Sequence, residues 1–494
     1  MKTLGLESLA RLPADVERPR YDPTRVRVGI VHLGLGAFHR AHQAVYTDDV
    51  LASDPNWGIL GVSMKTPRAT AALSAQQGLY TVLAKDATTT SARVVGALRE
   101  TAFARDDVSA LVQRIAHDDV RVVTLTVTEK GYCRSADGGL DLQHPDIVDD
   151  LAAPARPRSA IGLLVAAMDK RRRDGGAPIN VVSCDNLPSN GRVLERLVRE
   201  LASHRSADLV AWIDANVAFP ATMVDRIVPA TTPDDQAEVE RRLGMRDAAP
   251  VVAEPFSQWV IEERFAAAIP DWRSAGATLV GDVEPFETMK LRMLNGSHST
   301  LAYLGFLAGH PTIAGAASDP TLRAFVERQM LEEVAPSLRP PPGMRPSDYA
   351  HTLMQRFANP ALPHKTAQVA MDGSQKLPQR WLATIRDNLA AQRSVSHLAV
   401  SVAAWMRYVC GRDGSGNATD VVDPLSARFA SIAAANRDAR GIARELFSIA
   451  SIFGEDLAKD PRIVEPVTAA LSSMLELGAV GTVQRFERIR AHRP

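Results

Sequence analysis

The sequence is poor in cysteine, in net charge and in long apolar runs, and each shortage excludes a class of protein. Its three cysteines, Cys133, Cys184 and Cys410, stand far apart, so we expect no disulfide framework and a reducing compartment. The 57 Lys+Arg residues balance the 57 Asp+Glu residues, which leaves no broad attraction for nucleic acid or anionic lipid. We find neither a signal-peptide pattern nor an uncharged apolar run of about 18 residues. A cytoplasmic protein with a small-molecule partner, and without nucleic-acid or membrane partners, is therefore predicted.

Short β-branched runs alternate with helical patterns over the first 280 residues. The pattern predicts strands at residues 26–33, 57–64, 80–85, 93–100, 121–129 and 179–184, all continuing one sheet. A helix is expected from an N-cap at Ser159 to the basic run before Gly175. Strands alternating with helices indicate parallel βαβ units and an α/β fold.

The texture changes near Asp282 to long Ala/Leu/Arg/Met-rich helical periods interrupted by breakers such as the Pro340–Gly343 segment. We therefore expect two domains. Residues 1–282 form a Rossmann-type dinucleotide-binding domain, and residues 283–494 form a mostly α-helical domain that binds substrate.

A glycine turn follows the first strand and opens a helix. Gly34 and Gly36, with Ala37 and Phe38 after them, stand where backbone N–H groups approach a dinucleotide pyrophosphate. His39 occupies the place of the third glycine of G-x-G-x-x-G, so helix and strand are expected to lie further apart there. A purely structural turn fits the same residues.

The end of the second strand lacks the carboxylate that usually accepts the ribose hydroxyls of NAD. The segment reads Ser63-Met64-Lys65-Thr66-Pro67-Arg68, and its two cations suit a 2′-phosphate. NAD is the expected cofactor, and NADP stays open beside it.

A helical pattern after the domain change carries Lys290, Asn295 and His298. At about 100° per residue these positions fall within an arc of roughly 140°, so all three side chains can face one cleft. A lysine among apolar residues and a second cation exchanges a proton near neutrality, which hydride transfer from an alcohol requires. Asn295 suits an oxyanion donor. A solvated Lys290 and a core His298 are the alternative.

Other candidate groups end strands or share a helix face. Asp185-Asn186 follows the strand 179–184, where Asn186 suits a second oxyanion donor or a plain turn. The His39-x-x-His42 pair has no third ligand near it in sequence, so no metal is expected. No P-loop and no G-x-S-x-G elbow is present, which argues against kinase and hydrolase chemistry.

Seven blocks of the chain, in order, resemble the polyol-specific long-chain dehydrogenase family, which includes mannitol 2-dehydrogenase and fructuronate reductase. The blocks are IVHLGLGAFHRAHQA, LTVTEKGYC, SCDN, TMVDRIVPA, MKLRMLNGSHS, MDGSQKLPQR and WMRY. The resemblance covers nearly the whole chain and implies a zinc-independent, NAD(P)-linked alcohol dehydrogenase that is often monomeric.

The resemblance also implies residue roles. Lys290 falls on the general acid/base, Asn186 and Asn295 on the oxyanion hole, and His298 on a substrate-binding histidine. Asp225 and Lys376 fall on residues that line the substrate pocket. The roles of three further residues near the predicted cleft stay open: Arg356, Asn359 and His364.

Two departures from the mannitol-type pattern favour a uronate substrate. Mannitol-type members have T-E-G-G-Y and an Arg-x-x-His before D-G-S, whereas this chain has Lys130 in the first motif and Gln368 with Met371 in the second. Lys130 suits a substrate carboxylate, or a surface or cofactor-phosphate contact. The expected reaction interconverts D-mannonate and D-fructuronate. Mannitol or arabinitol 2-dehydrogenation is the alternative, and a non-catalytic nucleotide sensor a remote one.

Overall fold

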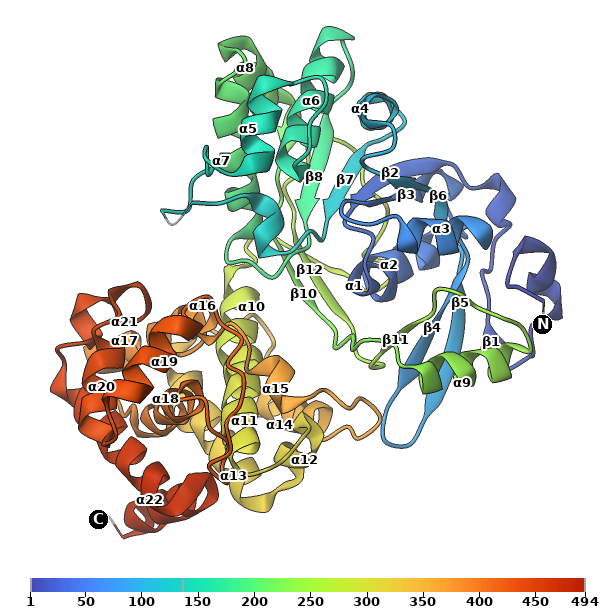
Figure 1. The fold of residues 1–494 in the computed structure, drawn as a ribbon. Helices are drawn as coiled ribbons and strands as arrows, with labels where there is room; N and C mark the ends of the chain where they lie inside the picture. The colour runs from blue at the N-terminus through green and yellow to red at the C-terminus, as the bar shows by residue number, and fades with distance from the viewer. Residues whose placement is uncertain (1, 136, 493–494) are drawn as a thin grey trace. The chain divides into compact units, whose positions relative to one another are not determined.

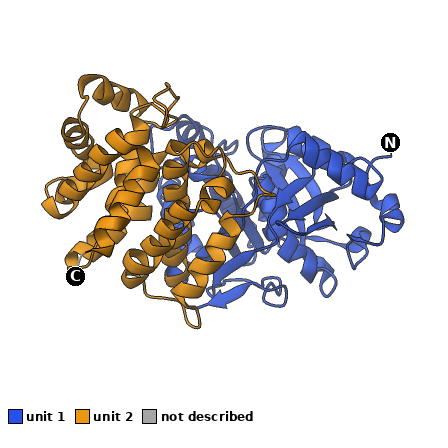
Figure 2. Cartoon of the chain, turned by 90° about the horizontal axis from the view of Figure 1, so that it is seen from below, with its two compact units in different colours: residues 1–284 blue, residues 285–494 orange. Residues whose placement is uncertain are grey.

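The computed structural model describes residues 2–135 and 137–492, which divide into two compact units (Figure 2). Unit 1 runs to Glu284 and unit 2 begins at Pro285.

Unit 1 is built on a six-stranded parallel sheet. Its strands lie in the order β6-β3-β2-β7-β8-β9. Counted along the chain from β2, this is the order 3-2-1-4-5-6 of the Rossmann fold, which confirms the predicted fold class. Every residue of β2, β3, β7 and β8 is buried, as expected of strands covered on both faces. The bounds are β2 Val28–Leu33, β3 Gly58–Ser63, β6 Leu98–Phe103, β7 Val122–Leu125, β8 Ile179–Ser183 and β9 Val217–Ala218.

Helices connect these strands, and Figure 1 shows α5 to α8 gathered beside β7 and β8. The predicted helix after Ser159 is α6, Ala160–Arg173; the Ser159 hydroxyl accepts the Gly162 N–H at 2.8 Å, and Gly175 follows with φ of 69°. The other helices of unit 1 are α1 Ala37–Ala41, α2 Gln43–Val50, α3 Arg68–Ala75, α4 Val108–Ala116, α5 Pro145–Ala152, α7 Asn190–Ser203, α8 Ala207–Asn216 and α9 Pro233–Leu243.

The prediction that all the early strands share one sheet is wrong for two of them. Residues 80–85 form β4, which pairs antiparallel with β5, Thr90–Val95, in a separate sheet of order β1-β5-β4-β11. The link between β4 and β5 is four residues, too short for the crossover that parallel strands need. The predicted strand 93–100 is split at Gly96, whose N–H donates to Asp48 at 2.8 Å, and its second half begins β6.

The remaining strands complete these smaller sheets. β1 is Val16–Glu17 and β11 is Val251–Ala253. A third sheet has the order β10-β12-β13, with bounds Thr222–Asp225, Gln258–Glu262 and Thr278–Val280.

Unit 2 is helical throughout its described residues, apart from short connections and isolated bridges, as its sequence texture predicts. Three of its helical segments are π-helices: η5 Lys290–Asn295, η6 Gln329–Val334 and η8 Pro378–Leu382. The α-helices are α10 Glu284–Met289, α11 Gly296–Leu307, α12 Ile313–Ser318, α13 Pro320–Arg328, α14 Pro346–Phe357, α15 Thr366–Val369, α16 Gly373–Leu377, α17 Ala383–Ala390, α18 Ser396–Val409, α19 Ser426–Ala435, α20 Ala439–Phe447, α21 Ala450–Leu457 and α22 Pro461–Ala491.

The last helix, α22, is the one described helix whose length and apolar composition match those of a membrane span. It carries Pro466, and Gly478 interrupts it with a φ of 70°. Val467, Leu471 and Val483 of this helix belong to the apolar core of unit 2. Its apolar composition is therefore accounted for in part by packing within the unit.

Candidate functional site

The glycine turn after β2 packs closely against Thr126, the residue that follows the neighbouring strand β7. Gly34 has a φ of 104°, and a Cβ at this position would lie 2.1 Å from the Thr126 carbonyl oxygen. The Gly34 carbonyl accepts hydrogen bonds from the Thr126 hydroxyl at 2.9 Å and from His32 Nε2 at 3.1 Å. Only glycine fits this close approach.

His39, which replaces the third glycine, packs on a histidine of the strand. The rings of His39 and His32 stack with centroids 3.3 Å apart and planes 8° apart. Burial lowers the pKa of His32 to about 3 and holds that of His39 well below its usual value. Both rings are therefore neutral, and they pack against each other where the helix follows the strand. His32 has no spacing signal in the sequence and was missed.

A cavity of about 410 Å³ opens at this turn, in the position expected for a dinucleotide. Gly36 borders it, and a Cβ there would meet nothing closer than the Gly34 carbonyl at 3.7 Å, so the glycine keeps space open beside the backbone. The helix that follows, α1, is only five residues long and breaks at His42. Much of the positive charge at the cavity comes instead from four basic side chains in its lining: Lys65, Arg105, Lys130 and Arg158.

Some of the predicted cofactor and substrate residues of unit 1 line this cavity, and others do not. Gly34, Gly36 and Lys130 line it, whereas Ala37 and Phe38 are not in its lining, and Phe38 stacks on the His42 ring at 5.0 Å. Lys130 thus lies with the glycine turn, which favours its cofactor-phosphate alternative.

Three possible metal ligands also border the cavity. Ligand atoms of Cys133, His144 and Asp146 lie within 4.8 Å of one another. Burial and nearby carboxylates raise the pKa of the Cys133 thiol to about 12, so the thiolate that a metal requires is disfavoured. The structure therefore provides no good metal ligand set among these three side chains.

The Asp185–Asn186 turn combines a structural residue with a candidate donor. Buried Asp185 accepts the N–H groups of Val127 and Thr128 at 3.0 and 2.8 Å and the Tyr132 hydroxyl at 2.8 Å. It therefore joins the ends of β7 and β8. Asn186 follows it with an exposed side chain at the carboxyl end of β8.

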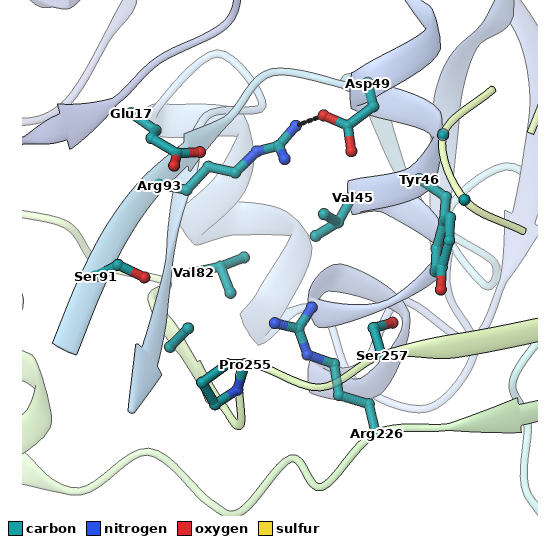
Figure 3. Close-up of a pocket in the computed structure, with 13 residues that line it drawn as sticks. Glu17, Val45, Tyr46, Asp49, Val82, Ser91, Arg93, Arg226, Pro255 and Ser257 are labelled. Atoms are coloured by element: carbon teal, nitrogen blue, oxygen red, sulfur yellow. Dashed lines mark hydrogen bonds and ion pairs between the residues drawn. The ribbon is translucent and has the colours of Figure 1, made fainter. Parts of the chain in front are cut away.

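A second cavity of about 410 Å³ in unit 1 lies between α2 and the smaller sheets (Figure 3). Arg93, paired with Asp49 at 2.5 Å, and Arg226 line it together with Glu17. Arg226 donates to the carbonyls of Glu254 at 2.9 Å and Ala41 at 2.5 Å, and so ties down the end of β10 that carries buried Asp225. Charges of both signs balance in this cavity.

The predicted catalytic helix of unit 2 is a π turn over Lys290–Asn295 and an α-helix only from Gly296 on, where α11 carries His298. Lys290 and Asn295 bound η5, and the Gly296 N–H donates back to the Leu291 carbonyl, five residues earlier. Because a π turn closes every five residues, it brings positions 290 and 295 closer to one face than the α-helical arc does. Such turns are frequent at functional sites, and periodicity alone does not reveal them.

Two buried side-chain nitrogens of this segment have no hydrogen-bond partner among the described residues. They are Asn295 Nδ2 and His298 Nε2. The His298 ring stacks on Phe357 with centroids 5.1 Å apart. Burial, and next the proximity of His364, hold the pKa of His298 well below its usual value, so this ring is neutral. Lys290 is 7% exposed. Unsatisfied polar atoms of this kind are costly unless a ligand meets them.

The other predicted or unassigned residues of unit 2 surround the same histidine. His364 lies edge-on to the His298 ring at 5.1 Å, and Arg356 and Lys376 are close enough to influence its charge. Asn359 accepts the Ala361 N–H at 3.1 Å. Arg380, which no motif singled out, donates to the Asn295 carbonyl at 3.2 Å and the Ser299 hydroxyl at 2.8 Å.

Comparisons with known proteins match both units. The family model for the mannitol dehydrogenase Rossmann domain matches residues 28–274, and that for the mannitol dehydrogenase C-terminal domain matches residues 282–475. D-mannonate oxidoreductase of Escherichia coli K12 is 47% identical over 470 residues, which are 94% of this chain and 96% of the relative. The uncharacterized oxidoreductase YeiQ of the same organism is 46% identical over 95% of this chain and 96% of its own.

A solved structure has the same fold over the full length. The ternary complex of Pseudomonas fluorescens mannitol 2-dehydrogenase with NAD and D-mannitol superposes with a TM-score of 0.90 at 36% identity, covering 99% of this chain and 100% of that one.

Proposed function

The chain belongs to the mannitol dehydrogenase family, and we propose that it is an NAD-linked dehydrogenase that interconverts D-mannonate and D-fructuronate in the cytoplasm, as a monomer. One observation carries the proposed chemistry. Buried Lys290 shares a π turn with Asn295, and Asn295 Nδ2 and His298 Nε2 are buried nitrogens without a described partner.

The reduction of D-fructuronate divides between the cofactor and these residues. Bound NADH supplies the hydride to the C5 carbonyl carbon, and the carbonyl π electrons pass to its oxygen. Asn295 donates a hydrogen bond to that oxygen as its negative charge grows, and Asn186 is the second donor that the family resemblance implies. Lys290 gives the oxygen a proton from Nζ, which yields the mannonate hydroxyl and a neutral amine. The oxidation of D-mannonate reverses each of these steps.

His298 is proposed to bind a substrate hydroxyl as a neutral ring. Its low pKa keeps the ring unprotonated at pH 7, so one ring nitrogen can donate to a substrate hydroxyl. Because the ring is fixed by Phe357 and His364, the hydroxyl is held in one orientation. Asp225 and Lys376 are proposed as further substrate contacts.

The residues of unit 1 fit a dinucleotide. Gly34 and Gly36 leave the backbone of the turn open to a pyrophosphate, with Ala37 and Phe38 following, and the basic lining suits its negative charge. Ser63 ends β3 and donates to the Thr66 carbonyl at 2.6 Å, and no carboxylate follows it before Arg68. Because this segment has no carboxylate to accept the ribose hydroxyls of NAD, activity with NADP is to be measured beside activity with NAD.

Two features support a sugar acid over a polyol. Gln368 and Met371 replace the Arg and His of the mannitol-type pattern. The D-mannonate oxidoreductase relative shares more identical residues with this chain than the solved mannitol 2-dehydrogenase does.

Initial rates with fructuronate and fructose, measured side by side with NADH and then NADPH, test the proposal. We expect a strong preference for fructuronate. Preference for fructose would make the protein a polyol dehydrogenase. NADH binding without turnover of any sugar acid or polyol would favour a sensor, and stoichiometric zinc in the purified protein would contradict the proposed chemistry.

A further inference from the structure

Basic side chains from three segments of unit 2 converge on His298. Arg356 ends α14, His364 precedes α15, and Lys376 and Arg380 lie one helical turn apart on α16 and η8. Arg356, Lys376 and Arg380 contribute positive charge near the His298 ring, whereas burial lowers the pKa of His364, which leaves that ring neutral at pH 7. This concentration of positive charge lies in the same part of the unit as the proposed catalytic residues.

Two of these cations lack an anionic partner. Lys376 Nζ donates to the carbonyls of Met371 at 2.5 Å and Val369 at 3.3 Å, and Arg380 donates to Asn295 and Ser299. In the part of the chain that the structure describes, neither side chain forms an ion pair. Burial therefore lowers the pKa of Lys376 to about 8 and that of Arg380 to about 10. Clustered buried cations without a counter-ion are unfavourable, and an anionic ligand removes that cost.

Two carboxylates act on Lys376, first Asp372 at the start of α16 and then Asp423. Asp423 accepts the Ser374 N–H at 2.8 Å, the Ser374 hydroxyl at 2.6 Å and the Leu425 N–H at 2.9 Å. Asp423 therefore holds the loop before α19. Among the described residues neither Asp372 nor Asp423 forms an ion pair with Lys376 or Arg380, so the positive charge of these two side chains remains available to a ligand.

Arg380 has the geometry for a carboxylate. Both of its described hydrogen bonds are made through Nη1, and no bond is described for Nε or Nη2. The Nε–Nη2 edge of a guanidinium matches the two oxygens of a carboxylate. D-fructuronate carries its carboxylate four carbon–carbon bonds from the carbon that accepts hydride.

We propose that Arg380, with Lys376 beside it, binds the substrate carboxylate and thereby selects sugar acids over neutral polyols. This inference rests on the proposed function and moves the carboxylate partner from Lys130, which lies at the dinucleotide cavity of unit 1, to unit 2. Nη1 of the same guanidinium donates to the Asn295 carbonyl. Arg380 would therefore both bind the carboxylate and position Asn295, the proposed oxyanion donor.

The test is the ratio of kcat/KM for fructuronate to kcat/KM for fructose, with NADH, in Arg380→Met and Arg380→Lys. We expect Arg380→Met to lower kcat/KM for fructuronate about 100-fold more than that for fructose, because a charged hydrogen-bond pair is lost for one substrate only. Arg380→Lys keeps the charge but loses the paired donors, so its ratio should fall between wild type and Arg380→Met.

Arg440→Met, a change at an exposed arginine of α20, is the matched control and should leave the ratio unchanged. Equal losses for both substrates would show that Arg380 only supports Asn295 and would overturn the proposal. If Arg380→Met does not fold, the ratio in Arg380→Lys decides: an unchanged ratio refutes carboxylate binding. Failure of the proposed function looks different, because the wild-type protein would then not reduce fructuronate.

Discussion

The charge state of Lys376 makes the affinity for a sugar acid depend on pH. Burial lowers the pKa of this lysine from 10.5 to about 8, and the neighbouring charge of Arg380 lowers it next. Asp372 at the start of α16 and Asp423 act in the opposite direction, while Lys376 itself helps to lower the pKa of His364. Only the protonated lysine attracts a carboxylate, so the attraction is present below pH 8 and is lost as the pH rises through this value.

The size of the effect follows from that pKa. With a pKa of about 8, the protonated fraction of Lys376 falls from about nine-tenths at pH 7 to about one-tenth at pH 9. The kcat/KM for fructuronate should therefore fall about tenfold over these two pH units through Lys376 alone. Fructose carries no charge and lacks this dependence.

The assay divides the pH profile of kcat/KM for fructuronate by that for fructose. Lys290 donates its proton to either substrate, so its titration cancels in the ratio. In Lys376→Arg the side chain stays charged past pH 9, and the ratio should become flat. A wild-type ratio that is constant between pH 7 and pH 9 would refute the assignment of Lys376 to the carboxylate.

Four further substitutions test the site and the glycine turn. Lys290→Met should lower kcat at least 100-fold while the Kd of NADH, measured by fluorescence titration, stays unchanged; a wild-type kcat would contradict its role. Gly34→Ala should destabilise the fold by about 3 kcal/mol, because its Cβ would lie 2.1 Å from the Thr126 carbonyl, whereas Gly36→Ala should leave Tm unchanged and weaken NADH binding. Trp381→Phe removes the bond from Nε1 to the Gly296 carbonyl at 3.0 Å, which should cost about 1 kcal/mol in thermal unfolding and lower kcat for both substrates alike.

Local patterns were sufficient to predict the four buried strands of the central sheet, β2, β3, β7 and β8, whereas β6 was predicted only in part and β9 was not predicted. Each of the four buried strands is a β-branched run, and the glycine turn stands directly between a strand and a helix, so context made a weak motif interpretable. The separate sheet around β4 and β5 was not predicted, because a strand's own residues do not say which strand it pairs with. The four-residue connection between them was the available signal.

The site in unit 2 was predicted in its residues but not in its geometry. An assumed α-helical period placed Lys290 and Asn295 140° apart, and the π turn that brings them together has no periodic signature. His364 and Arg380 were not assignable from spacing, because each reaches His298 or Asn295 from a segment more than sixty residues away. Such contacts depend on how the helices of the unit pack.

The contacts of Arg380 and Trp381 indicate why the catalytic segment can keep its π turn. Their side chains hold the carbonyls of Asn295 and Gly296 at 3.2 and 3.0 Å, where η5 passes into α11. These bonds offset part of the cost of the less favourable π geometry. The same segment, η8, therefore fixes the oxyanion donor and presents a cation beside it. Binding energy from a remote carboxylate then acts on the side chain that positions Asn295, which is how binding far from the reacting carbon can raise kcat.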